Sequence, residues 1–139
     1  MISPNDIPAG NSKSEIKERE KIIRSFYKGW MEDNPSKSRY NISLKDDINI
    51  RNISVVETSE HASKKYLSTL AVLQLDSILV NARKVKTVKS DASARNQNAF
   101  EKMIIMESLL PGIGTVKLTV GVKRRDKSKV QYCITVLKA

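Results

Sequence analysis

The chain has 139 residues, enough for one domain with its own core, and its five glycines and four prolines exclude a collagen-like or low-complexity protein. The single cysteine excludes an intrachain disulfide, and no apolar run reaches the ~18 residues of a membrane span, so we expect a cytoplasmic protein without membrane contact. Lys and Arg total 25 against 15 Asp and Glu, and the resulting charge of +10 is typical of nucleic-acid binders, although solubility alone would also explain it.

The N-terminal third predicts an arm and one helix. Residues 1–13 contain Pro4, Pro8 and Gly10 and are expected to form a flexible arm, with residues 14–139 as a single α+β domain. A helix follows and ends at Asn34-Pro35. Its charged residues, Arg19 among them, are expected on the exposed face. Its apolar face carries Ile16, Ile23, Phe26, Tyr27 and Trp30.

The middle of the chain predicts a loop, a strand and helical structure. Residues 36–47 are polar and predict a loop, in which Asp46-Asp47 are expected to serve the loop or a helix cap rather than a metal. Residues 48–56 alternate as in a strand. Thr58 or Ser59 is then a suitable N-cap, and residues 60–82 predict one helix or two.

The C-terminal half predicts a sheet. Residues 85–88 alternate as a short strand, residues 89–98 predict a loop, and residues 100–110 fit either a helix or a strand. A turn at 111–114 leads into alternating strands at 116–122 and 130–136, joined by a hairpin tip at 125–128. The Gly112-Ile113-Gly114 turn is too short for a phosphate-binding loop. The fold class is therefore α+β, with N-terminal helices packed on a small antiparallel sheet that ends in a three-stranded meander.

Two clusters of basic residues stand out in this half, each opposed by one aspartate. A phosphate backbone could bind along them. The alternative is that they protect a sheet edge from aggregation. Tyr132 is the one aromatic residue nearby that could stack on a base. The first cluster is Arg83, Lys84, Lys86, Lys89 and Arg95; the second is Lys117, Lys123, Arg124, Arg125, Lys127 and Lys129.

His61 is the only histidine, which excludes a two-histidine ribonuclease mechanism within this chain. His61 could still form an acid–base pair with Glu57 or Glu101. Lys64 or Arg95 could then stabilise the negative charge of a phosphorane-like state. The alternative is an exposed histidine in the first turn of a helix. Cys133 alternates with apolar residues and is expected to be a sheet thiol rather than a nucleophile.

The order of elements carries a resemblance to a known group of domains. The helix-start segment 59–65, the segment 78–85 and the last strand, 130–134, resemble the barnase/EndoU/colicin/RelE-like domains of polyvalent proteins from phages and mobile elements, over roughly residues 48–137. This resemblance implies an RNA-directed or nucleic-acid-associated role. It also implies that residues 100–110 form a strand. The site residues that it implies are Ser63, His61, Lys64 and Tyr132.

These observations lead to one main hypothesis with two alternatives. The main hypothesis is a small nucleic-acid-associated protein of a phage or mobile element, a degenerate RNase-like domain that binds RNA or DNA. The alternatives are an active ribonuclease that uses His61, and a protein-interaction module or inhibitor acting on a host or phage protein. No cofactor and no metal are expected.

Overall fold

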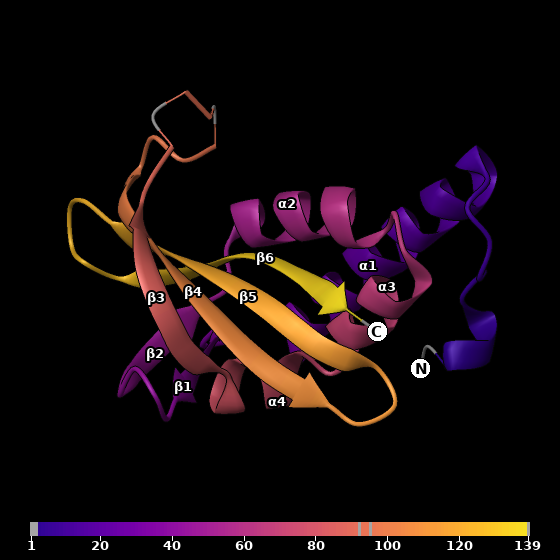
Figure 1. Ribbon diagram of the computed structural model, residues 1–139, viewed down its shortest axis with the longest axis horizontal. Coiled ribbons are helices and arrows are strands. Elements are labelled where there is room, and N and C mark those ends of the chain that lie inside the picture. The colour runs from indigo at the N-terminus through magenta and orange to yellow at the C-terminus, as the bar shows by residue number, and fades with distance from the viewer. Residues whose placement is uncertain (1–2, 92, 95, 139) are drawn as a thin grey trace.

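The computed structural model describes residues 3–91, 93–94 and 96–138, and Figure 1 shows the arrangement of its helices and strands. No helix in these ranges is long and apolar enough to cross a membrane. In chain order the elements are η1 (Pro4–Asp6), α1 (Lys13–Asp33), β1 (Ser38–Asn41), β2 (Asp46–Asn49), α2 (Asn52–Ala62), α3 (Tyr66–Val72), α4 (Leu75–Asn81), β3 (Arg83–Lys89), β4 (Phe100–Leu110), β5 (Gly114–Lys123) and β6 (Lys129–Lys138).

The strands form one six-stranded sheet in the order β1-β2-β6-β5-β4-β3. The last four strands are an antiparallel meander, and β1 and β2 form a separate hairpin that joins β6 through one short parallel pairing. The predicted fold class, helices on a sheet that ends in a meander, is confirmed, and so is strand at 100–110. The strand β1 and the parallel pairing were not predicted, and β2 overlaps the predicted strand 48–56 only at residues 48–49.

The helices cover one face of this sheet and form the main core with it (Figure 1). Alternate residues of β5 point into that core, which explains the period-two pattern in the sequence. A buried polar network joins the helices to β6: the Tyr27 hydroxyl donates to Gln131 Oε1, and Gln131 Nε2 donates to Thr58 Oγ1 at 2.9 Å. Burial raises the pKa of Tyr27 well above its usual value. These bonds satisfy polar groups that would be costly to bury alone.

Several local predictions in the first half are wrong. Residues 53–56 belong to α2 rather than to a strand, and Thr58 and Ser59 are buried inside this helix instead of capping one. The helix begins at Asn52 because Arg51 N donates to Ser54 Oγ at 3.0 Å, which caps the turn. The predicted loop 36–47 contains β1 and the start of β2. The region 60–82 breaks twice, which leaves α3 and α4 as separate short helices.

The start of α1 also differs from expectation. Arg19 was predicted on the exposed face, yet its side chain is fully buried. It contacts the preceding segment, residues 3–12, which was predicted as a flexible arm. This segment contains η1 and buries Ile7. Ser12 caps α1 by accepting a hydrogen bond from Glu15 N.

β3 is the edge strand of the meander, and all seven of its residues are exposed. A register shift between Lys84 and Lys86 marks a bulge in its pairing with β4. Four of the seven residues are basic, and none of these four forms an ion pair with a described acidic side chain.

Candidate functional site

The sheet face opposite the main core carries a cleft of about 440 Å³, between the end of α2 and the loop that joins β3 to β4. The pairing of β4, β5 and β6 sets its floor, because Ile105, Thr119 and Cys133 lie in one row across these strands. Lys117 and Thr135 form the next row. The lining residues are His61, Val88, Lys89, Asp91, Gln97, Met103, Ile105, Lys117, Thr119, Tyr132, Cys133 and Thr135.

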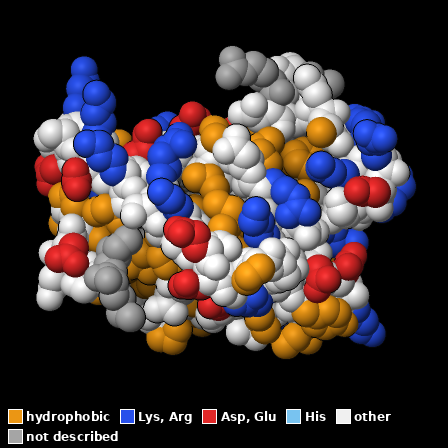
Figure 2. Space-filling view, turned by 180° about the vertical axis from the view of Figure 1, so that it is seen from behind, with side chains coloured by type: hydrophobic (Ala, Val, Ile, Leu, Met, Phe, Trp, Pro, Cys, Tyr) orange, Lys and Arg blue, Asp and Glu red, His pale blue; other side chains and the backbone are white. Residues whose placement is uncertain are grey.

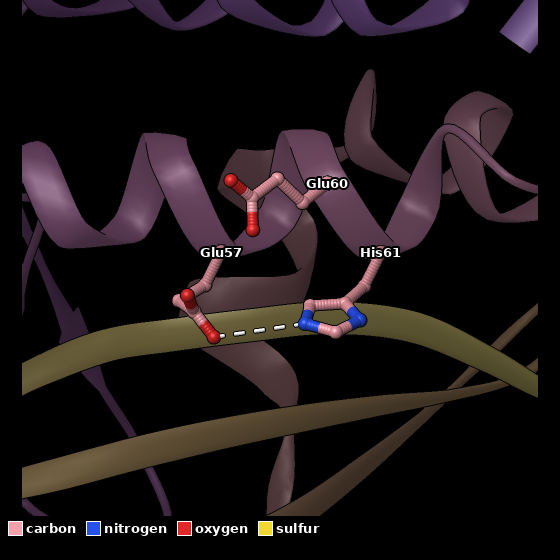
Figure 3. A group of neighbouring side chains, drawn as sticks. All are labelled: Glu57, Glu60 and His61. Atoms are coloured by element: carbon pink, nitrogen blue, oxygen red, sulfur yellow. Dashed lines mark ion pairs between the residues drawn. The ribbon is translucent and has the colours of Figure 1, made fainter. Parts of the chain in front are cut away.

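His61 enters this cleft from the last turn of α2, with Glu57 one turn earlier. His61 Nε2 lies 3.6 Å from Glu57 Oε1, and the imidazole is half exposed whereas the Glu57 side chain is 7% exposed. Figure 3 shows both side chains pointing toward β6, with the other ring nitrogen of His61 directed away from Glu57. The carboxylate facing Nε2 favours a proton on that nitrogen and leaves Nδ1 as the acceptor.

Glu57 is held in place from two sides. Asn96, in the loop after β3, donates from Nδ2 to Glu57 Oε2 at 2.6 Å, which leaves Oε1 for His61. The Cys133 thiol donates to the Glu57 carbonyl oxygen at 3.8 Å and so ties α2 to β6. The amide of Asn96 thus holds the carboxylate of Glu57, which in turn faces the imidazole of His61. A base oriented by a third group in this way is typical of catalytic sites.

Tyr132 and Cys133 both line the cleft because a register shift in β6 brings them to the open face. Burial, followed by the neighbouring Glu57 carboxylate, raises the pKa of Tyr132 to about 12. Burial and the Glu57 charge raise the pKa of Cys133 to about 12. At neutral pH, Tyr132 is thus a hydrogen-bond donor, and Cys133 is a poor nucleophile, since the thiolate is the reactive form.

The Tyr132 ring rests on a small apolar cluster of its own. Phe100 meets it edge to face, with ring centroids 6.1 Å apart, and Met103 and Val130 complete the cluster. Phe100 lies directly over Gly121, where no side chain would fit beneath the ring. The residues below Tyr132 are therefore almost fully buried, Phe100 and Val130 with 1% of their surface exposed.

The sequence matches the family model of large polyvalent protein-associated domain 3 over residues 18–131. The chain belongs to this family. The predicted link to polyvalent proteins of phages and mobile elements is confirmed to that extent. A search of curated proteins gave no significant match, and neither did a search of solved structures.

The structure brings some of the predicted site residues of this polyvalent-protein domain together and separates others. His61, Tyr132, Lys89 and Lys117 come together in the cleft. Lys64 and Ser63 do not line it: Lys64 is exposed beyond the end of α2, and Ser63 is buried. His61 is exposed, as the alternative interpretation held, but it lies at the end of a helix and not in its first turn. Arg95 lies outside the described residues.

The remaining cations lie on β3 and at the β5–β6 hairpin. Arg83 and Lys84 line a second hollow at the far end of β3, together with Glu107. Arg124 Nε donates to the Asn98 carbonyl at 3.3 Å. Seen from the side opposite to Figure 1, basic side chains gather at the end of the domain that the β5–β6 hairpin forms, and elsewhere they alternate with acidic ones (Figure 2).

Two lysines of the second basic cluster, which lies at the β5–β6 hairpin, form ion pairs within the domain. Lys127 forms an ion pair with Glu101, which removes Glu101 as a partner for His61. Lys129 lies 2.7 Å from Asp46. Two of the predicted phosphate-binding lysines are therefore already paired with carboxylates from other strands, so Lys89 and Lys117 in the cleft are the better placed cations.

One group could also hold a divalent cation. The ligand atoms of Glu57, Glu60 and His61 lie within 4.8 Å of one another (Figure 3). Glu60 is exposed and does not line the cleft. The same histidine and carboxylate would then act as metal ligands instead of as an acid–base pair.

Sequence reasoning missed Asn96, Gln97, Thr119 and Thr135. The two threonines lie one strand apart on the open face, and strand pairing had to be known to place them beside His61. Asn96 sits in a loop without periodicity, so no sequence pattern pointed to Glu57 as its partner.

Proposed function

We propose that this domain binds RNA in the cleft and cleaves its phosphodiester bond by acid–base catalysis with His61. The observation that carries the proposal is the convergence of the His61–Glu57 pair, the Tyr132 hydroxyl and two lysines on one hollow face. The cytoplasmic location expected from the sequence belongs to this proposal, and so does the resemblance to barnase-like ribonucleases.

In the proposed reaction the ribose 2′-hydroxyl gives its proton to His61 Nδ1 while its oxygen attacks the neighbouring phosphorus. Glu57, held by Asn96, stabilises the imidazolium that forms. The P–O5′ bond breaks, and the products are a 2′,3′-cyclic phosphate and a 5′-hydroxyl. With one histidine in the chain, the leaving oxygen needs another acid, and Tyr132 is the neutral one in the cleft.

Lys89 and Lys117 would stabilise the phosphate charge, which grows in the transition state. Both line the cleft on the side of the sheet that faces His61, and neither forms an ion pair with a described residue. Each phosphate contact should lower the slope of log K against log salt by about 0.7 for a single strand. Two contacts in the cleft therefore predict a slope near −1.4, and the exposed cations of β3 would steepen it.

The test is cleavage of a fluorescent single-stranded RNA by the wild type and by His61→Ala. We expect the variant to lose at least 100-fold in kcat/KM, because general acid–base catalysis contributes about that much or more. Glu60→Gln is the matched control, since Glu60 is exposed on the same helical turn and lies outside the cleft. A substrate with a 2′-deoxy sugar at the cleaved position should not react.

Two results would contradict this reaction. Unchanged cleavage by His61→Ala would remove the assigned base. Cleavage that EDTA abolishes and that Glu60→Gln also impairs would point to the Glu57–Glu60–His61 group as a metal site instead.

A second candidate function, nucleic-acid binding without cleavage, is favoured by β3, where four exposed cations form no ion pair with a described residue. In that case Lys86→Gln and Lys89→Gln should weaken binding at low salt, and His61→Ala should leave it unchanged. The absence of RNA and DNA binding at low salt would refute both candidates and leave a protein partner.

A further inference from the structure

Arg19 is a buried cation without a charge partner among the described residues. Its side chain is fully buried, and among residues 3–91, 93–94 and 96–137 it is the one Lys or Arg that is buried. No carboxylate of these ranges forms an ion pair with it. Burying a charge is costly unless it is well hydrogen-bonded, so its contacts indicate what it does.

The guanidinium joins two segments that are far apart in the sequence. Arg19 Nη1 donates to the carbonyls of Pro8 and Gly10, at 2.7 and 2.5 Å. Nη2 donates to Asn11 Oδ1 at 3.3 Å. Nε donates to the Ser63 carbonyl at 2.7 Å. All four acceptors are neutral oxygens, and one planar group satisfies them together.

Ser63 is the C-cap of α2, two residues after His61. The last carbonyls of a helix lack partners within the helix, and a basic side chain that binds one of them stabilises that end. The neighbouring last-turn bonds are long: Lys64 N donates to the His61 carbonyl at 3.4 Å, and Lys65 N to the Ala62 carbonyl at 3.2 Å. The Arg19 bond to Ser63, at 2.7 Å, is shorter than either of these.

We propose that Arg19 is a positioning residue, which fixes the end of α2 that carries His61 against the segment 8–11. This role of Arg19 rests on the proposed function, because it links the segment 8–11 to the reaction proposed for the cleft. The segment lies before the family match at residues 18–131, so the functional unit extends beyond the matched range.

The test compares Arg19→Met with Arg24→Met in the full chain. Both variants remove one charge from α1, but Arg24 is exposed and reaches Glu20 at 3.9 Å only. For Arg19→Met we expect kcat for RNA to fall at least tenfold with KM within twofold, because the lysines that bind the phosphate are untouched. Arg24→Met should keep both constants within twofold. Arg19→Lys should restore part of kcat, since one donor can still reach a carbonyl.

Hydrogen exchange supplies a readout that does not need catalysis. The Lys64 and Lys65 amides should exchange at least tenfold faster in Arg19→Met than in the wild type, and at the wild-type rate in Arg24→Met. If Arg19→Met does not fold, Asn11→Ala removes one of the four bonds and should raise the same two rates to a smaller extent.

Equal exchange in Arg19→Met and wild type would overturn the proposal, and so would a fall in kcat that Arg24→Met shares. If the wild type cleaves no RNA, the proposed reaction is wrong, and the exchange rates alone then decide whether Arg19 anchors the His61 end of α2.

Discussion

Replacing Gly121 by alanine should destabilise the domain, and the reason can be tested directly. A Cβ at residue 121 would lie 2.6 Å from Phe100 Cδ1 and 2.7 Å from Phe100 Cε1 and Cγ, so the ring must move by about 0.8 Å to reach ordinary contact at 3.4 Å. Phe100 is 1% exposed and has little room to move. Overpacking of this kind costs about 1–3 kcal/mol. For a domain of this size we expect a Tm roughly 3–15 °C lower.

The effect of Gly121→Ala should change sign in the background of Phe100→Ala. That substitution alone should cost about 3–5 kcal/mol, because a buried ring is lost. Without the Phe100 ring, the methyl group added at residue 121 has room. Gly121→Ala should then stabilise the folded domain by about 0.4–1 kcal/mol, because alanine lowers the conformational entropy of the unfolded chain. The sign of the effect therefore reverses between the two backgrounds.

Urea unfolding of the four proteins, followed by circular dichroism, measures this cycle. Gly29→Ala is a useful control, since nothing lies within 4 Å of a Cβ there and alanine should stabilise helix α1 by about 0.5–1 kcal/mol. If Gly121→Ala costs the same with and without the Phe100 ring, contact with Phe100 is not the cause and the reasoning fails.

Three further outcomes are expected. Cys133 should react with iodoacetamide roughly 100- to 1,000-fold more slowly than a free thiol at pH 8, because its pKa of about 12 leaves little thiolate, and unfolding should restore the rate. The hydrogen bond from Lys129 lowers the pKa of Asp46 in the folded protein. The ion pair therefore stabilises the fold at pH values above the unfolded pKa of 3.8, and this stabilisation is lost as the pH falls through the pKa of the folded state. Asp46→Asn should accordingly cost about 0–1 kcal/mol of stability at pH 7 and nothing at pH 2. A fragment limited to residues 18–131 should not fold, since it lacks most of β6, and a cooperative unfolding transition would contradict this.

The C-terminal strands could be predicted because their apolar residues alternate and one face packs on the helices. Segment 100–110 could not be decided by pattern, since Met, Leu and Glu are good helix formers, and pairing with β3 and β5 makes it a strand. Helix α2 was missed for a different reason. Its buried face carries Ser54, Thr58 and Ser59, so its helical period is one of small polar residues rather than of apolar ones.

The candidate site was predictable in part. The Glu57–His61 pair follows from the i, i+4 spacing once the segment is known to be helical. Tyr132 reaches the cleft through a register shift in β6, which no periodicity reveals. Arg19 looked like a surface residue because its acceptors are mostly backbone carbonyls, and these do not depend on residue type.

The exposed edge strand β3 has a consequence for the behaviour of the protein in solution. Its open edge could pair with that of a second molecule, but Arg83, Lys84, Lys86 and Lys89 repel the same residues on another copy. A bound polyanion would cancel that repulsion. The domain should therefore stay dispersed with polyanion in excess or absent and become turbid near charge neutrality, and added salt should dissolve the precipitate as it releases the polyanion.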